Sequence, residues 1–279
     1  MIETAKPAKT VICAGAEPLR PRERIVAALR GAAKAGQPAL VAYLTAGFPS
    51  RERFREHLLS IAGAADVIEV GVPFSDPMAD GVTIQRASEQ ALRTGVNLRW
   101  ILSELESLSQ SQSLRTPLLL MSYLNPLLAY GLSRLALDAA RAGVCGFIVP
   151  DLPFDESDEF RAAMADAALG LVQMVTPVTP PERMAKVAAA SEGFVYAVTM
   201  TGTTGRSAGT SAGMADYLER VRACAAVPVC AGFGIRTREQ VEALRGMVDG
   251  VVVGSALVEV LERGESAQQW LAALRAPRR

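Results

Sequence analysis

The sequence has little of the chemistry that metal and Schiff-base enzymes depend on. It contains one histidine, His57, and four lysines, Lys6, Lys9, Lys34 and Lys186. One histidine is too few for a multi-histidine metal site, and it leaves a single candidate for a His-centred triad. None of the lysines ends an apolar, strand-like run, where burial would lower the pKa of a Schiff-base lysine. Any chemistry is therefore expected to use carboxylates, hydroxyls and backbone amides, with no metal.

Cysteine and net charge are also scarce. The four cysteines, Cys13, Cys145, Cys224 and Cys230, show no CxxC spacing, which favours free thiols in a reducing cytoplasm over disulfides or a zinc site. Lys+Arg (29) balances Asp+Glu (29), which argues against a nucleic-acid or membrane-surface role. The longest apolar runs are far shorter than the roughly 20 residues of a membrane helix, and we find no secretory signal. A cytoplasmic protein is expected.

Short apolar runs alternate with helical patterns along most of the 279 residues. Residues 1–21 are Lys/Pro/Ala-rich and lack periodicity, so we expect a flexible extension before a single domain over 22–279. Strands are predicted at 39–45, 67–70, 118–122, 146–149, 171–175, 194–198, 227–231 and 250–253. Helices are predicted at 22–35, 51–63, 82–94, 98–109, 132–142, 155–168, 181–190, 214–225, 237–244, 256–263 and 267–274.

Eight strand–helix units with short connections favour an α/β fold of the (β/α)8 TIM barrel type with an extra N-terminal helix. A doubly wound open sheet is the alternative. It is weakened because no Gly-x-Gly-x-x-Gly follows the first strand, as a dinucleotide-binding sheet would require.

Two carboxylates follow the barrel rule that active sites lie at the carboxyl ends of the strands. Glu69 sits inside an apolar run, where an unpaired carboxylate is costly, and burial there would raise its pKa toward the range useful for proton transfer. Asp80 ends the polar loop that follows. Our hypothesis is that this pair is the chemical centre. The alternatives are a structural Glu69 and an Asp80 that caps the next helix.

Other segments suggest substrate binding. Gly234 follows the seventh strand and Gly254-Ser255 follow the eighth, where barrels often bind phosphate, although glycines there can simply make tight turns. The long segment 201–209 is either a lid or a plain connector. His57 is expected to be a solvated helix residue.

Several motifs together resemble the tryptophan synthase alpha chain family. They cover the region from about Arg22 to the C-terminus, and the second-strand motif is the most specific. The segments are 40–49 (LVAYLTAGFP), 69–81 (EVGVPFSDPMADG), 121–126 (MSYLNP), 147–153 (FIVPDLP), 201–205 (TGTTG), 232–235 (GFGI) and 254–255 (GS).

The resemblance implies cleavage of indole-3-glycerol phosphate to indole and glyceraldehyde 3-phosphate, a retro-aldol step without Schiff base or metal. In that family's pattern Glu69 is the acid and base, and Asp80 hydrogen-bonds the indole N–H. Thr204 of the lid closes onto Asp80. The remaining implied site residues are Tyr196 near Glu69, Gly205, Phe233, Gly234, Gly254 and Ser255 around phosphate and substrate, and Leu120, Tyr123 and Phe233 around the indole.

The family also implies a beta-chain partner that carries PLP and receives the indole, in an alpha2beta2 heterotetramer. Asp76, Pro77 and Asn125 are the candidate contacts with it. Three alternatives stay open: a stand-alone indole-glycerol-phosphate lyase, a non-catalytic activator of the beta chain, and another phosphate-binding barrel such as a sugar-phosphate isomerase. Indole release with and without a beta chain, and binding of indolepropanol phosphate, distinguish them.

Overall fold

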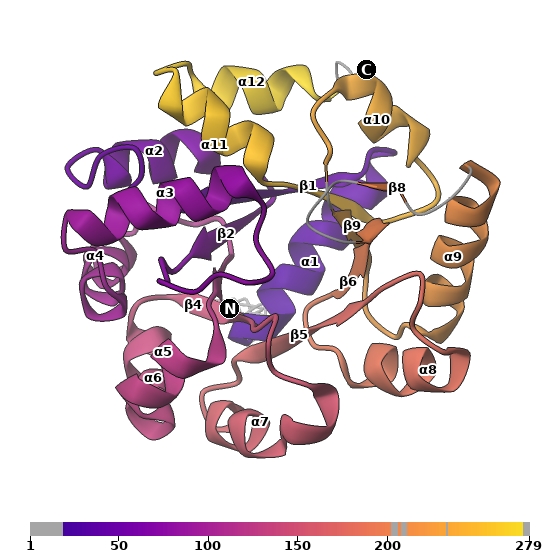
Figure 1. Cartoon of the computed structure of the whole chain (residues 1–279), viewed down its shortest axis with the longest axis horizontal. Helices are drawn as coiled ribbons and strands as arrows, with labels where there is room; N and C mark the ends of the chain where they lie inside the picture. Colours follow the sequence, from indigo (N-terminus) through magenta and orange to yellow (C-terminus); the bar gives the residue numbers. More distant parts are fainter. Residues whose placement is uncertain (1–18, 202–205, 208–210, 233, 276–279) are drawn as a thin grey trace, which may run out of the picture.

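The strands close into a parallel barrel surrounded by helices, as the alternation of patterns predicts (Figure 1). The computed structural model describes residues 19–201, 206–207, 211–232 and 234–275. Around the barrel the strands follow the order β1-β10-β9-β6-β5-β4-β3-β2. They are β1 (Ala39–Thr45), β2 (Val67–Gly71), β3 (Leu118–Met121), β4 (Val144–Ile148), β5 (Gly170–Val175), β6 (Val195–Val198), β9 (Val229–Gly232) and β10 (Gly250–Val253). The TIM-barrel prediction is confirmed.

Helices cover the outside of the barrel in chain order (Figure 1). They are α2 (Phe54–Ala62), α3 (Val82–Arg93), α4 (Leu98–Gln110), α5 (Leu124–Tyr130), α6 (Leu132–Arg141), the 3-10 turn η1 (Phe154–Glu156), α7 (Asp158–Ala165), α8 (Pro181–Ala190), α9 (Ser211–Cys224), α10 (Arg238–Ala243), α11 (Ser255–Glu262) and α12 (Ala267–Ala273). One large apolar cluster fills the layer between strands and helices. Within the described residues, none of the helices combines the length and apolar character needed to cross a membrane.

The extra N-terminal helix α1 (Pro21–Lys34) closes one end of the barrel. Its buried residues Ile25 and Leu29 pack with Ala39, Val41 and Phe194, which lie at or near the amino ends of their strands. The predicted helix over 22–35 is therefore confirmed within a residue at each end. Because α1 covers the amino ends, the carboxyl ends of the strands form the open mouth.

The connection after β6 and the segment after β3 contain elements that the sequence did not predict. β7 (Met200–Thr201) and β8 (Arg206–Ser207) pair antiparallel. Helix α5 begins right after Tyr123, in a stretch for which no helix was predicted and which includes Pro126. Proline is tolerated in the first turn of a helix, where no intrahelical donor is needed, so the motif is compatible with a helix start.

His57 is buried, so the expectation of a solvated side chain is wrong. Its exposed fraction is 5%, and its Nε2 has no hydrogen-bond partner among the described residues. The buried face of α2 runs through Phe54, His57, Leu58 and Ile61. This is the i, i+3, i+4, i+7 spacing of an apolar helix stripe, which places His57 on the packed side despite its Arg/Glu neighbours.

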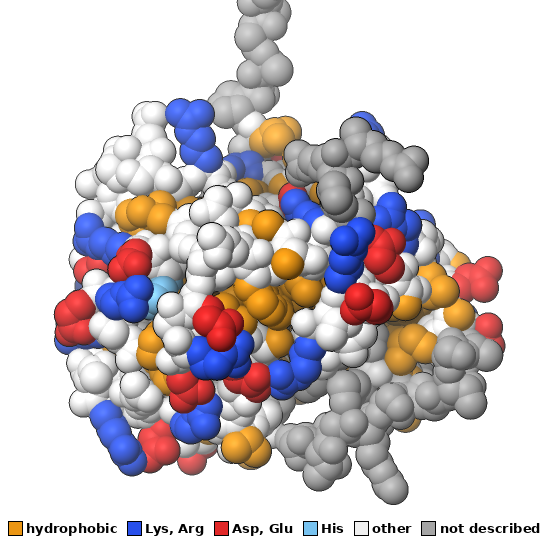
Figure 2. All heavy atoms as spheres, turned by 90° about the horizontal axis from the view of Figure 1, so that it is seen from above, with side chains coloured by type: hydrophobic (Ala, Val, Ile, Leu, Met, Phe, Trp, Pro, Cys, Tyr) orange, Lys and Arg blue, Asp and Glu red, His pale blue; other side chains and the backbone are white. Residues whose placement is uncertain are grey.

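Charges of both signs are mixed over the surface. Figure 2 shows Lys/Arg and Asp/Glu side chains lying beside one another on the face drawn there. This arrangement agrees with a formal net charge of zero, and that face carries no extended field of one sign.

Candidate active site

Glu69 lies inside the barrel, close to its mouth. It is the third residue of β2, and the strand registers place it beside Tyr43 of β1 and Leu119 of β3. Its side chain is 2% exposed, and its Oε2 has no hydrogen-bond partner in the described part of the chain. Burial, together with the negative charge of Asp80, raises the pKa of Glu69 to about 8.

Asp80 ends the connection between β2 and α3, and it is also buried. Burial raises its pKa to about 6, while a hydrogen bond from the Tyr123 hydroxyl opposes that rise. Its backbone N–H donates to the Pro77 carbonyl (3.0 Å), and its own carbonyl accepts from Gln85 Nε2 (2.9 Å). The N-cap of α3 is Gly81 and no side chain caps it, so Asp80 does not act as a helix cap.

Tyr123, which follows β3, contacts the loop between β2 and α3 that carries Asp80. Its hydroxyl accepts a hydrogen bond from the Ala79 backbone N–H (2.9 Å), and its ring stacks on Phe74 with centroids 5.3 Å apart. Burial and the Asp80 charge raise the pKa of Tyr123 above its usual value, so the phenol keeps its proton. A neutral hydroxyl beside Asp80 is a donor that keeps the carboxylate in place.

Two further tyrosines face the carboxylates, and glycines make room for them. A Cβ on Gly71 would lie 2.2 Å from the Tyr43 hydroxyl, and one on Gly232 would lie 2.4 Å from the Tyr196 hydroxyl. Both tyrosines are buried, and the charges of Glu69 and Asp80 contribute to raising their pKa values.

Tyr43 is the residue that sequence reasoning missed. The available signal was its position two residues before Thr45 on one strand face, because side chains alternate along a strand. Its hydroxyl lies 3.2 Å from Thr45 Oγ1.

Three residues predicted for phosphate binding lie at the mouth on neighbouring strands. Gly234 follows β9 with φ +78°, a left-handed conformation that favours glycine. Gly254 and Ser255 start α11, and a Cβ on Gly254 would be 3.7 Å from Tyr43 Cβ. This proximity places the start of α11 next to the carboxylate site. The predicted residues Thr204, Gly205 and Phe233 lie outside the described residues.

The structure does not bring Leu120 to the carboxylates. Leu119, not Leu120, is in register with Glu69, so Leu120 points to the opposite side of the sheet. Leu120 is fully buried in the cluster between strands and helices, where Leu127 also packs. Met121, the next residue on the inner side, packs against the apolar cluster that contains Tyr43. We expected Leu120 to line the indole pocket. That expectation is corrected, because Leu119, one residue earlier, is the residue in register with Glu69.

The candidate partner contacts are exposed near the Asp80 loop. Asp76 and Asn125 are exposed, and Pro77 is half-buried. Two strongly exposed apolar side chains follow Pro77 in the chain: Met78 in the loop and Val82 at the start of α3, each 79% exposed. A cavity of about 480 Å³ opens beside this loop, lined by Phe74, Ser75, Pro77, Val82, Gln85, Arg86, Glu89 and Leu92.

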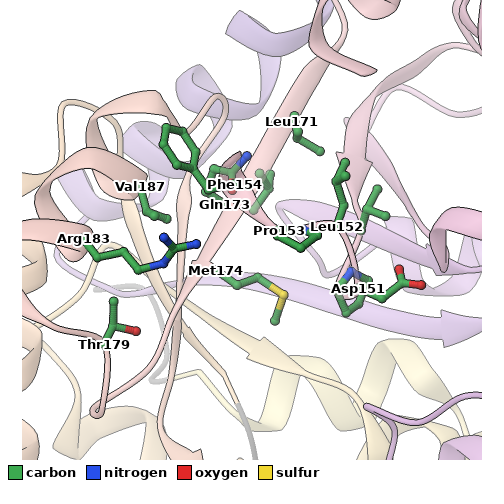
Figure 3. A pocket seen from close by; sticks show the side chains of 13 residues that line it. Asp151, Leu152, Pro153, Phe154, Leu171, Gln173, Met174, Thr179, Arg183 and Val187 are labelled. Atoms are coloured by element: carbon green, nitrogen blue, oxygen red, sulfur yellow. The ribbon is translucent and has the colours of Figure 1, made fainter. Parts of the chain in front are cut away.

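A second cavity, of about 260 Å³, lies between the segment after β4, strand β5 and helix α8 (Figure 3). Gln173 and Arg183 supply polar groups to its wall, and Arg183 Nη1 pairs with Asp155 Oδ2 at 2.6 Å. In the described part of the chain, none of the residues predicted to bind substrate lines it. Among all the residues that the structure describes, no group of three or more His, Cys, Asp or Glu side chains could hold a metal ion.

Comparisons with known proteins agree with one another. A family model described as Tryptophan synthase alpha chain matches residues 29–278. The tryptophan synthase alpha chain of Nitratidesulfovibrio vulgaris is 46% identical over 251 residues, covering 90% of this chain and 97% of that protein. The alpha chain of Bacillus mycoides is 43% identical over 242 residues, covering 86% and 91%.

Solved structures show the same similarity. A chain of tryptophan synthase from M. tuberculosis has a TM-score of 0.80 at 36% identity, covering 90% of this chain and 96% of that one. Tryptophan synthase subunit alpha from Legionella pneumophila has a TM-score of 0.81 at 31% identity, with coverage of 90% and 96%. The similarity therefore extends over the barrel as a whole.

Proposed function

Because the chain belongs to the tryptophan synthase alpha chain family, we propose that Glu69 and Asp80 carry out that family's lyase reaction in this protein. The protein catalyses the alpha reaction of tryptophan biosynthesis, the cleavage of indole-3-glycerol phosphate to indole and glyceraldehyde 3-phosphate. The observation that carries the residue assignment is the pair of buried carboxyl groups at the barrel mouth, whose pKa values are raised to different extents.

The two carboxyl groups have different protonation states near neutral pH. Glu69, with a pKa of about 8, keeps its proton, whereas Asp80, with a pKa of about 6, is ionised. An acid beside a carboxylate is the division of roles that environment can impose on two chemically similar groups. Since the Asp80 charge contributes to the raised pKa of Glu69, the ionised group helps to keep its neighbour protonated.

The proposed reaction begins with proton transfer from the Glu69 carboxyl to C3 of the indole. Positive charge then develops on the ring nitrogen, and the Asp80 carboxylate, accepting a hydrogen bond from the N–H, stabilises it. The Glu69 carboxylate next takes the proton of the glycerol hydroxyl. The carbon–carbon bond breaks, its electron pair returns to the ring, and indole and the aldehyde are released.

The remaining site residues are assigned to substrate placement. Gly234, Gly254 and Ser255 bind the phosphate through backbone N–H groups, with Gly205 and Phe233 completing that end. Tyr196 and Tyr123 flank the carboxylates, and Thr204 closes onto Asp80. The first backbone N–H groups of a helix such as α11 have no intrahelical partner, which supports an anion at this position.

A tryptophan synthase beta chain is the partner that family membership implies. We place its contact on the loop that carries Asp76 and Pro77 and on Asn125 of α5, in an alpha2beta2 assembly. The strong exposure of Met78 on that loop and of Val82 at the start of α3 supports this assignment, because exposed apolar side chains gathered in one place are typical of interaction surfaces. PLP is assigned to the beta chain, with no cofactor in this one. The catalytic unit is residues 22–279, with 1–21 as an extension, and it acts in the cytoplasm.

The test is turnover of indole-3-glycerol phosphate by the pure chain, with and without a beta chain, following both products. Glu69→Gln is expected to lower kcat by roughly 10²–10⁴-fold, the usual contribution of a general acid–base. Asp80→Asn is expected to cost roughly 10²-fold or more through lost charge stabilisation. The matched control is Asp155→Asn, which removes an exposed carboxylate paired with Arg183. Unchanged indole production by Glu69→Gln would refute the assignment.

A further inference from the structure

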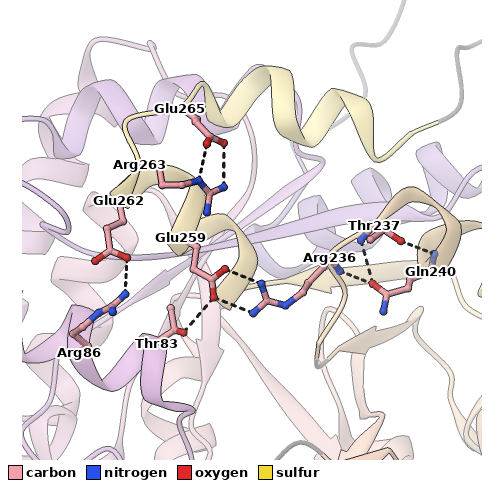
Figure 4. Close-up of polar contacts among 9 residues, drawn as sticks. All are labelled: Thr83, Arg86, Arg236, Thr237, Gln240, Glu259, Glu262, Arg263 and Glu265. Carbon is pink, nitrogen blue, oxygen red and sulfur yellow. Dashed lines mark hydrogen bonds and ion pairs between the residues drawn. The ribbon is translucent and has the colours of Figure 1, made fainter.

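A polar cluster joins three segments on the outer side of the site (Figure 4). Its centre is the carboxylate of Glu259 on helix α11. Glu259 Oε2 and Oε1 accept hydrogen bonds from Arg236 Nη1 (2.7 Å) and Nη2 (2.9 Å). The Thr83 hydroxyl donates to Oε1 from 3.4 Å. One side chain thus contacts the β9–α10 connection and the start of α3.

Each of these residues is close in the chain to a residue of the proposed site. Arg236 follows Gly234 by two residues, and Thr83 follows Asp80 by three. Glu259 lies four residues, about one helical turn, beyond Ser255. The cluster therefore links both phosphate-binding segments to the helix that comes directly after the Asp80 loop.

Arg236 is held from its backbone side as well. Its N–H donates to Gln240 Oε1 (2.7 Å), within the capping box that Thr237 and Gln240 form at the start of α10. A guanidinium that binds a carboxylate through two parallel hydrogen bonds fixes orientation as well as distance. A displacement of the β9–α10 connection is thus transmitted to Glu259.

Helices α3 and α11 are joined again one turn further along, where Arg86 pairs with Glu262. Beneath these polar contacts Ala87 of α3 and Val258 of α11 pack in one apolar cluster with Tyr43. The two helices therefore share a polar and an apolar contact, and the apolar contact includes Tyr43, which lies beside Glu69.

We propose that Glu259 is a positioning residue that couples the phosphate-binding end of the site to the Asp80 end. Through Arg236 and Thr83 it keeps the two phosphate-binding segments and the start of α3 in one arrangement, so an anion bound at Gly234, Gly254 and Ser255 favours the conformation in which Asp80 receives the indole. This inference rests on the proposed function.

The experiment measures the coupling between the two halves of the substrate. Calorimetry on the full chain gives the Kd of indole alone and in the presence of saturating glycerol 3-phosphate. In the wild type we expect glycerol 3-phosphate to tighten indole binding by roughly fivefold or more, within the usual range of coupling between sites. In Glu259→Ala and in Arg236→Ala this factor is expected to fall to less than half, and the double variant is expected to be no worse than either single one.

The matched control is Glu265→Ala. It breaks the two-bond ion pair of Arg263 with Glu265 (2.6 and 3.0 Å), which lies beside the cluster in Figure 4 but joins residues only two apart in the chain. That variant is expected to keep the wild-type coupling factor. If Glu259→Ala does not fold, Glu259→Gln, which preserves the shape and removes the charge, takes its place.

The outcomes separate the two proposals. If the wild type binds neither indole nor glycerol 3-phosphate, the proposed function fails. If both bind but the wild type shows no coupling, or the Glu259 variant keeps more than half of it, Glu259 is not a positioning residue. A lower indole affinity with an unchanged coupling factor would indicate a merely structural role and would also overturn the inference.

Discussion

Replacing Glu69 by glutamine should remove a large part of the pH dependence of folding stability. A carboxyl group whose pKa is higher in the folded chain than in the unfolded one binds its proton more readily when folded. The stabilisation that such a group contributes is present in full below its pKa in the unfolded chain. It is lost as pH rises through its pKa in the folded chain. For Glu69 this window runs from the ordinary pKa of 4.5 to about 8.

The magnitude follows from the displacement of the pKa. Moving it from 4.5 to about 8 corresponds to roughly 5 kcal/mol of preference for the protonated form in the folded chain. Between about pH 5 and about pH 8 the wild type should therefore lose roughly 3 kcal/mol of stability relative to Glu69→Gln. The cost of ionising Glu69 is high because its buried Oε2 has no hydrogen-bond partner in the described part of the chain.

The assay is urea unfolding of both proteins at the two pH values, comparing the difference in free energy of unfolding. Glu239→Gln is the control. Glu239 is exposed and its pKa is lowered, so its contribution is lost as pH falls and has the opposite sign. A wild-type to Glu69→Gln difference that changes by less than about 1 kcal/mol over this range would refute the argument that burial holds Glu69 in its protonated form.

Three further outcomes are expected. The kcat/KM of the wild type should rise with pH through about 6 as Asp80 ionises and fall through about 8 as Glu69 loses its proton, which a pH–rate profile measures; a flat profile over that range would contradict the assigned roles. Gly71→Ala should displace the Tyr43 ring, since its Cβ would meet the hydroxyl at 2.2 Å, and should lower both activity and Tm; an active variant of wild-type Tm would show that the ring has room to move. Leu120→Ala should cost roughly 2–5 kcal/mol of stability through the cavity it leaves while KM stays unchanged, which urea unfolding and steady-state kinetics measure; a raised KM without loss of stability would return Leu120 to the substrate pocket.

The barrel could be predicted from the sequence because the patterns that indicate its strands and its helices are both local. Short apolar runs such as 250–253, flanked by helical patterns, depend only on neighbouring residues, and the strand β10 has those bounds. The barrel rule then places Glu69 and Asp80 at one end without any distance being known. Both carboxyl groups are buried and have raised pKa values, which agrees with the interpretation that an ionised Glu69 is costly in its apolar run.

What the sequence could not determine depends on register and on contacts between distant segments. Leu119 and Leu120 are chemically the same, so only the pairing of β3 with β2 decides which of them faces Glu69. Tyr43 reaches the site because Gly71, on another strand, leaves room for its ring. His57 is a different case, since its helical spacing from Phe54 contained the signal, and its polarity outweighed that signal in the interpretation.

The closure of the barrel has a consequence for how the chain folds during its synthesis. β1 pairs with β10, so the hydrogen bonds of residues 39–42 on that side can form only after residues 250–253 have been synthesised. Until nearly the whole protein has left the ribosome, one side of β1 is an open sheet edge, the kind of surface on which nascent chains associate wrongly. A truncation that ends before β10 would keep that edge exposed permanently, and such fragments should depend on chaperones far more than the full chain does.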